Sequence, residues 1–135
     1  MVLVDSSVWI HYFNGAITPE TDTLDTLLGQ DLVLMGDLIL TEVLQGFCDN
    51  HEYRLARELL DPLELRVLGG REVALQADDN YRTLRSRGIT VRKTIDVIIG
   101  SYCLLNGIPL LHADRDFDAL EIHLGLKVHR GGVMG

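Results

Sequence analysis

The sequence predicts a three-layer α/β/α fold in which helices cover both faces of a central parallel sheet. Short apolar runs alternate with longer segments of helical periodicity, and this alternation is typical of parallel α/β folds. Residues that start or stop helices separate most of these segments. The chain has 135 residues, of which 47% are hydrophobic and 24% are charged. We therefore expect one folded domain that spans residues 1–135.

Five short apolar segments have the composition of buried strands. The predicted strands span residues 2–4, 32–35, 63–68, 110–113 and 126–129. Helical segments separate the first four of these strands, and such connections favour parallel pairing.

Capping residues and helical periodicity mark seven helices. Ser6 and Ser7 open the first helix, and Gly15 ends it. Thr94 is predicted to cap a helix that Gly107 ends. The predicted helices span residues 6–14, 19–28, 38–47, 52–60, 71–87, 95–106 and 116–123. From residue 130 onward, three glycines predict a loose tail.

Charge and composition exclude several classes of protein. The net charge of −8 disfavours a surface that coats nucleic acid, because phosphate binding needs clustered Lys and Arg. It leaves room for an enzyme that meets phosphate through metal ions, and it suits a cationic protein partner. No apolar run approaches the roughly 20 residues of a membrane span, and no secretory signal is visible. Two cysteines make no disulfide framework, so we expect a cytoplasmic protein with no membrane association.

Four acidic residues lie within or directly after apolar runs, where an unpaired charge is costly to bury. They are Asp5, Glu42, Asp96 and Asp114. Two of them end predicted strands, and a third lies on the helix that leaves the second strand. The carboxyl ends of parallel strands meet at one edge of a sheet, so we expect these side chains to share a crevice.

Asp96 lies on a helix that is apolar on nearly every side. Gly100 and Cys103 follow it on the same stripe, at i+4 and i+7. Two small residues below an acid predict room for a pocket.

Gathered carboxylates need a cation. One like-charged pair at 4 Å costs about 4 kcal/mol at an effective dielectric constant near 20. Mg²⁺ and Mn²⁺ select hard oxygen ligands, and Mg²⁺ shares itself with substrate phosphates. Because such an ion can activate water and stabilise a leaving oxygen, the acids indicate phosphodiester hydrolysis.

Four motifs carry a resemblance to a known family. They lie at residues 2–10, 41–46, 92–100 and 111–117, and each contains one of the four acids. In this order and at these spacings they resemble the PIN-domain ribonucleases of the VapC type, the toxins of type II VapBC toxin–antitoxin pairs. The resemblance covers nearly the whole chain.

The resemblance implies an Mg²⁺- or Mn²⁺-dependent endoribonuclease that cleaves RNA such as transfer or ribosomal RNA. It also implies a homodimer and inhibition by a cognate antitoxin protein. The family's catalytic and metal-binding acids fall on Asp5, Glu42, Asp96 and Asp114.

Three further positions bear on the site. Asp116 falls on another acidic position near the metal, and Ser6 falls on a hydroxyl position that supports the first acid. Ala113 stands where many members have Thr or Ser, which leaves open whether Asp114 or Asp116 lies closer to the metal.

Basic residues near Asp96 and Asp114 are candidates for contact with substrate. These candidates are Arg92, Lys93 and Arg115. Arg92 and Lys93 belong to a basic cluster with Arg82, Arg85 and Arg87. The alternative for this cluster is a solvated helix face on which Asp78 pairs with Arg82.

Each acid also has an ordinary structural interpretation. Asp5 would be a helix cap, Glu42 a surface acid, and Asp114 and Asp116 turn residues. Asp96 would be a core acid paired with Arg92 or Lys93.

Two other functions remain open. One is an acidic pocket that binds a basic peptide without catalysis. The other is an aspartate-based phosphotransfer protein, which the sequence disfavours because no lysine ends a later strand.

Overall fold

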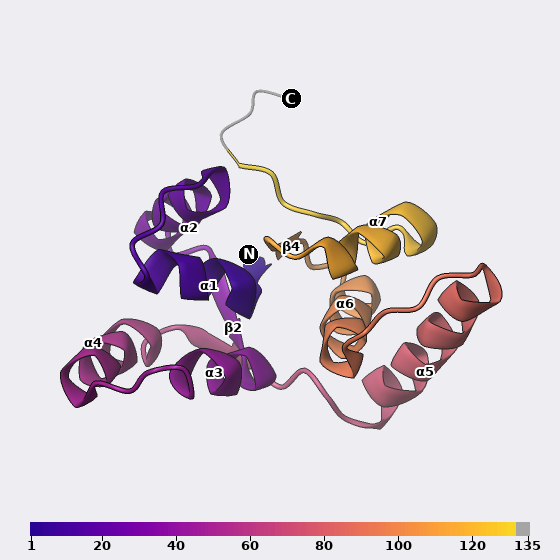
Figure 1. Cartoon of the computed structure of the whole chain (residues 1–135), viewed down its shortest axis with the longest axis horizontal. Helices are drawn as coiled ribbons and strands as arrows, with labels where there is room; N and C mark the ends of the chain where they lie inside the picture. The colour runs from indigo at the N-terminus through magenta and orange to yellow at the C-terminus, as the bar shows by residue number, and fades with distance from the viewer. Residues whose placement is uncertain (132–135) are drawn as a thin grey trace.

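The computed structural model describes residues 1–131 and contains a four-stranded sheet with helices on both sides (Figure 1). The strand order is β3-β2-β1-β4, and every neighbouring pair is parallel. The strands are β1 (Val2–Val4), β2 (Val33–Gly36), β3 (Glu64–Arg66) and β4 (Leu110–Leu111). The predicted parallel α/β fold is confirmed.

The helices divide between the two sides of the sheet. In Figure 1, α1 and α2 lie to the left of the strands, α6 and α7 lie to the right, and α5 packs outside α6. The helices are α1 (Ser6–Phe13), α2 (Pro19–Gly29), α3 (Asp37–Leu44), α4 (Asn50–Leu60), α5 (Arg71–Ser86), α6 (Thr94–Asn106), the 3₁₀ turn η1 (Arg115–Phe117) and α7 (Asp118–Leu124). None of the helices in residues 1–131 is both long and apolar enough to cross a membrane.

Some predicted boundaries differ from the structure. The N-cap of α6 is Lys93 rather than Thr94, and no side chain accepts a capping hydrogen bond there. The predicted fifth strand at residues 126–129 is wrong, because only one isolated parallel bridge joins Leu110 to Val128. β4 has only two residues, so it offers a very short edge for a further strand.

The predicted tail begins with an ordered residue. Arg130 donates to both carboxylate oxygens of Glu121, at 2.8 and 2.9 Å. Residues 132–135 of the predicted tail lie outside the described residues.

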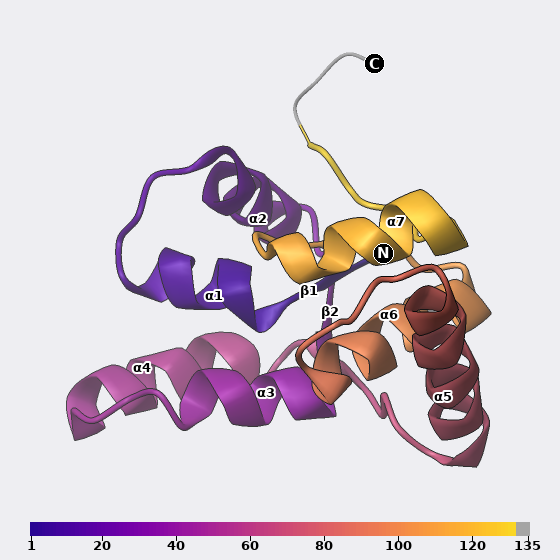
Figure 2. The ribbon, with the colours of Figure 1, turned by 45° about the vertical axis from the view of Figure 1, so that its right-hand side comes forward.

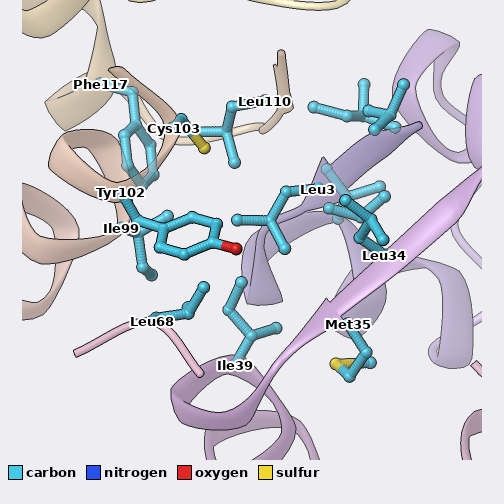
Figure 3. Close-up of a cluster of buried hydrophobic side chains, with 14 of the residues drawn as sticks. Leu3, Leu34, Met35, Ile39, Leu68, Ile99, Tyr102, Cys103, Leu110 and Phe117 are labelled. Atoms are coloured by element: carbon cyan, nitrogen blue, oxygen red, sulfur yellow. The ribbon is translucent and has the colours of Figure 1, made fainter. Parts of the chain in front are cut away.

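The core holds the strands against α6. Leu3 and Leu110 are fully buried, and Figure 3 shows Ile99, Tyr102 and Cys103 of α6 facing them. A buried hydrogen bond also joins α6 to α5: the Asn80 amide donates to Ser101 Oγ at 2.9 Å. Asp96 lies at the first turn of this fixed helix, so its position follows from the core.

Gly100 and Cys103 do not open a pocket below Asp96, and this prediction was wrong. A Cβ atom added at Gly100 would meet a methyl group of Leu120, from α7. Cys103 is only 1% exposed and packs in the core. Small residues on a buried helix permit close packing by a neighbouring element, and here that neighbour fills the space.

Gly36 connects β2 to the helix that carries Glu42. A Cβ atom there would collide with the buried side chain of Leu68, whose Cγ would lie at 2.8 Å. We expect Gly36→Ala to lower the free energy of unfolding by about 1–3 kcal/mol through overpacking. Gly29→Ala is the matched control, since a Cβ there meets nothing within 4 Å. Equal stability of the two variants in urea titrations would contradict the steric argument.

Candidate functional site

The starts of α1 and α6 lie close to α3 (Figure 2). An acidic crevice between them is lined by the start of α1, the first turn of α6 and the C-terminal half of α3. Its volume is about 360 Å³. The side chains that line it are Asp5, Ser6, Ser7, Ile10, His11, Glu42, Gln45, Lys93, Asp96 and Asp114. The structure therefore brings all four predicted acids to one cavity.

A larger cavity of about 500 Å³ adjoins this crevice. It lies between the start of α2 and the segment from β4 to α7, and it includes Arg115. Asp114 is the only one of the four acids that borders both cavities. We take the smaller cavity as the candidate site because the carboxylates converge there.

Asp5 combines a structural role with a place in the crevice. Its Oδ2 caps α1 by accepting hydrogen bonds from Ser7 N at 3.0 Å and Ser7 Oγ at 2.6 Å. Its Oδ1 is buried and has no hydrogen-bond partner within residues 1–131. One oxygen thus fulfils the helix-cap interpretation, while the other remains available to a cation.

Two neighbouring serines hold different acids. Ser7 Oγ donates to Asp5 and accepts a hydrogen bond from Ala113 N at 3.0 Å. Ser6 Oγ donates to Glu42 Oε1 at 3.2 Å. The hydroxyl that supports the first acid is therefore that of Ser7, whereas the sequence prediction assigned this role to Ser6.

Sequence reasoning missed Ser7, although a local signal was present. A helix N-cap side chain bonds the backbone N–H two residues later, so a hydroxyl at that second position lies within reach of the same oxygen. The Asp-Ser-Ser sequence of residues 5–7 contains this arrangement.

Asp96, Asp114 and Asp116 form the tightest group of acids. Each offers a carboxylate oxygen, and these three oxygens lie within 4.8 Å of one another. Asp114 Oδ1 accepts a hydrogen bond from Asp116 N at 3.0 Å, which orients the Asp114 side chain even though Ala113 lacks a hydroxyl. Both Asp114 and Asp116 are thus within reach of one cation bound at Asp96.

Of the three predicted basic residues, only Lys93 contacts the acids. Its Nζ lies 3.1 Å from Asp114 Oδ2 and 3.9 Å from Asp96 Oδ2. Arg92 and Arg115 are exposed and form no ion pair within residues 1–131, so they remain candidates for contact with substrate. The alternative pair of Asp78 with Arg82 is also absent from this part of the chain.

Burial and like charge alter the acidity of the site. Desolvation, followed by the charge of Asp5, raises the pKa of Asp96 from 3.8 to about 7. Desolvation also raises the pKa of Asp5, and desolvation together with the charge of Asp5 raises that of Glu42. Partial burial opposes ionisation of Asp114, but hydrogen bonds from Asp116 N and Lys93 outweigh it and lower the pKa.

The donor set suits a hard divalent cation. Asp5 Oδ1 and Asp96 Oδ2 are buried oxygens without hydrogen-bond partners in the described chain, and such groups are costly unless something binds them. The remaining ligands on offer are carboxylate oxygens, which Mg²⁺ and Mn²⁺ prefer. The residues present therefore fit such an ion.

A parallel α/β/α sheet with a carboxylate crevice at its carboxyl edge defines a class of domains suited to binding a cation at that edge. The chain belongs to the PIN domain family, whose sequence profile matches residues 2–122. The resemblance of the four motifs to this family is confirmed.

Curated relatives cover almost the same length. The chain is 27% identical over 122 residues to VapC ribonuclease Mb1587 of Mycobacterium bovis and to ribonuclease VapC11 of Mycobacterium tuberculosis. Each alignment covers 89% of this chain and 91% of the relative.

Solved structures share the fold. VapBC2 of Rickettsia felis, crystallised with a promoter DNA fragment, aligns with a TM-score of 0.73 over 96% of this chain and 98% of that chain, at 13% identity. VapC20 of Mycobacterium tuberculosis, a toxin described as cleaving the sarcin–ricin loop, aligns with a TM-score of 0.64 over 88% of this chain and 94% of that chain, at 16% identity. At such identities the likeness concerns the fold alone.

The raised pKa of Asp96 predicts that stability in chelator falls as pH rises. The folded state holds the Asp96 proton up to about pH 7, whereas the unfolded state releases it near 3.8. The contribution of Asp96 to the free energy of unfolding is therefore largest below pH 3.8, and it is lost as the pH rises from there to about 7. The slope from this one group is at most about 1.4 kcal/mol per pH unit.

Urea titrations in chelator between about pH 5 and pH 8 measure this effect. Asp5 and Glu42 contribute in the same direction, while Asp114 acts in the opposite direction at lower pH. We expect the free energy of unfolding of Asp96→Asn to fall less steeply as the pH rises, because the amide has no charge to bury. Parallel pH profiles for the wild type and Asp96→Asn would show that Asp96 does not carry the effect.

Removal of the bridging Ser7 hydroxyl is expected to destabilise the fold. Ser7→Ala breaks the contacts with Asp5 Oδ2 and Ala113 N, so we expect a loss of about 1–3 kcal/mol in the free energy of unfolding. Ser86→Ala is the control, because its hydroxyl makes only a local, exposed contact with Thr83 O. That variant should stay within about 0.5 kcal/mol of the wild type. A Ser7→Ala protein as stable as the control would refute the bridge.

Proposed function

We propose that this chain is an Mg²⁺- or Mn²⁺-dependent endoribonuclease, a single PIN domain that acts as the toxin of a type II toxin–antitoxin pair. The observation that carries the proposal is the convergence of carboxylates on one crevice, where two buried oxygens have no hydrogen-bond partner among residues 1–131. Membership of the PIN domain family supports it, as do relatives that are named ribonucleases.

The solved neighbours support the antitoxin part of the proposal. They include VapBC2 of Rickettsia felis, a toxin–antitoxin complex from Klebsiella pneumoniae and VapBC of Salmonella typhimurium. We extend to this chain the expectation of a cognate antitoxin, a homodimer and a cytoplasmic location. The net charge of −8 suits a partner that presents a basic segment to the crevice.

The residues of the crevice have different roles in the proposed hydrolysis. When bound, Mg²⁺ or Mn²⁺ would supply neutralising charge and an activated water. Asp96, Asp114 and Asp116 offer the group of oxygens that would hold the ion. Asp5, whose Oδ1 has no hydrogen-bond partner within residues 1–131, borders the same crevice as Asp96 and Asp114 and would be a further ligand, and the Ser7 hydroxyl fixes the orientation of Asp5.

Glu42 is suited to a proton-transfer role. The Ser6 hydroxyl holds its Oε1, so Oε2 remains able to accept a proton from a water in the crevice. Burial and the charge of Asp5 raise the pKa of Glu42, which brings a carboxylate closer to the basicity that a general base needs.

Substrate must reach an acidic surface. The phosphate backbone of RNA is repelled by the net negative charge, so local cations have to guide it. Arg92, Lys93 and Arg115 are the basic residues nearest to the acids in the sequence, and Lys93 already contacts Asp114. We assign these three residues to the rim that meets RNA.

The two alternative functions have less support. Aspartyl phosphotransfer needs a lysine beside the phosphorylated carboxylate, yet Lys93 pairs with Asp114, and Asp5 has no ion pair within residues 1–131. A binding pocket without catalysis explains the acids but gives no role to the orientation of Asp5 by Ser7.

Metal-dependent cleavage of RNA tests the proposal. We expect purified protein to cut structured RNA in Mn²⁺ or Mg²⁺ and to stop when chelator is in excess. Asp5→Asn and Asp96→Asn should lower the cleavage rate by roughly 10²-fold or more, since each removes a charged metal ligand.

The control is Asp79→Asn, which removes an exposed acid on α5 outside the crevice and should leave the rate unchanged. Cleavage that persists in chelator would contradict the metal-dependent mechanism. Metal binding without cleavage of any RNA would favour the non-catalytic pocket.

A further inference from the structure

We propose that Lys93 competes with the divalent cation for the carboxylate of Asp114. The Lys93 ammonium group must leave this carboxylate before the metal binds. This inference rests on the proposed metal-dependent function and concerns how the chain controls access to its own ligands. It makes Lys93 a positioning residue that sets metal affinity.

Lys93 holds the oxygen of Asp114 that the backbone does not use. Asp114 Oδ1 accepts a hydrogen bond from Asp116 N at 3.0 Å, whereas Oδ2 accepts one from Lys93 Nζ at 3.1 Å. A carboxylate with one oxygen committed to the backbone coordinates a metal most readily through the other. The ammonium group therefore occupies the ligand position that a metal would use.

The same ammonium group lies beside a second metal ligand. Lys93 Nζ is 3.9 Å from Asp96 Oδ2, which is too far for a hydrogen bond, and that oxygen is buried without any partner in residues 1–131. Asp96, Asp114 and Asp116 offer oxygens within 4.8 Å of one another. A divalent cation among them would lie within a few ångströms of Nζ, where two like charges repel strongly.

Lys93 is able to leave without disturbing the fold. Its side chain is 57% exposed, and its only hydrogen bond from Nζ within the described residues goes to Asp114. The residue is the N-cap of α6, where its backbone is fixed but its four-carbon side chain is flexible. A released ammonium group stays tethered at the rim, close enough to meet an RNA phosphate.

An ordinary surface ion pair is the competing explanation. Exposed pairs contribute little to stability, and removing such a pair changes little else. The two explanations differ in one measurable quantity, the affinity of RNA-free protein for metal. Competition predicts tighter binding when Lys93 loses its charge, whereas an incidental pair predicts no specific change.

The chain offers a matched control because it contains only two lysines, Lys93 and Lys127. Lys127 is exposed and forms no ion pair within residues 1–131. Lys93→Met and Lys127→Met therefore remove the same charge from the same protein. Only the first substitution removes it from the crevice.

We expect Lys93→Met to bind Mn²⁺ about five- to tenfold more tightly than the wild type in calorimetric titrations without RNA. Lys127→Met should differ by less than about twofold, since its side chain is exposed to screening solvent and does not line the crevice. Lys93→Arg keeps the charge and should stay near the wild-type affinity. Equal affinities for the wild type and Lys93→Met would overturn the inference.

Lysine reactivity gives a second measurement that does not depend on a substitution. Trace acetylation followed by mass spectrometry reports how accessible each amine is. In chelator, the ion pair should protect Lys93, and saturating Mn²⁺ should raise its reactivity while that of Lys127 stays constant. Unchanged reactivity of Lys93 on adding Mn²⁺ would also overturn the inference.

The two proposals fail in different ways. Wild-type protein that does not bind Mn²⁺ in calorimetry would refute the metal site and the inference together. Wild-type protein that binds Mn²⁺ and cuts RNA, but whose affinity is insensitive to Lys93→Met, would refute only the competition.

Discussion

Repulsion between buried carboxylates is the constraint on which the rest of this structure depends. Parallel strands end at a common edge, and α1, α3 and α6 lie close to one another there (Figure 2). Acidic side chains from these elements line one crevice. The core fixes these elements, which means that the acids have little freedom to move apart. Burial, followed by the charge of Asp5, raises the pKa of Asp96, so the charged form of this carboxyl group is unfavourable in the crevice.

The chain compensates for this repulsion only in part. Hydroxyl and backbone donors hold Asp5 Oδ2, Glu42 Oε1 and Asp114 Oδ1. Lys93 supplies the one positive charge that contacts the acids within residues 1–131. Two buried oxygens have no hydrogen-bond partner in the described part of the chain, so the protein donors orient the acids and leave oxygens that a metal ion could bind.

The sequence singled out the four acids that line one crevice, because each of them interrupts or ends an apolar run. It did not predict contacts that depend on tertiary structure. The pairing of Lys93 with Asp114 joins residues 21 positions apart. The packing of Leu120 against Gly100 likewise depends on how α7 docks, and a stripe of small residues is equally consistent with a pocket or a close contact. The apolar composition of residues 126–129 predicted a strand, but only an isolated bridge forms at Val128. Composition alone cannot show that the neighbouring strand, β4, is only two residues long.

The distribution of rigid and mobile groups in the crevice follows from these contacts. Asp5 N–H donates to Leu111 O at 2.9 Å, and the Ser7 hydroxyl joins Asp5 to Ala113, so the ends of β1 and β4 are locked together. Asp5 is thus fixed at the end of β1, and Asp96 is fixed by the buried helix α6. The Lys93 ammonium group that neutralises the acids lies on a flexible side chain. In such a site the ligand oxygens would stay in place when the cation binds, and only the Lys93 ammonium group would be replaced. Binding then needs little reorganisation of the protein, which lowers its free-energy cost.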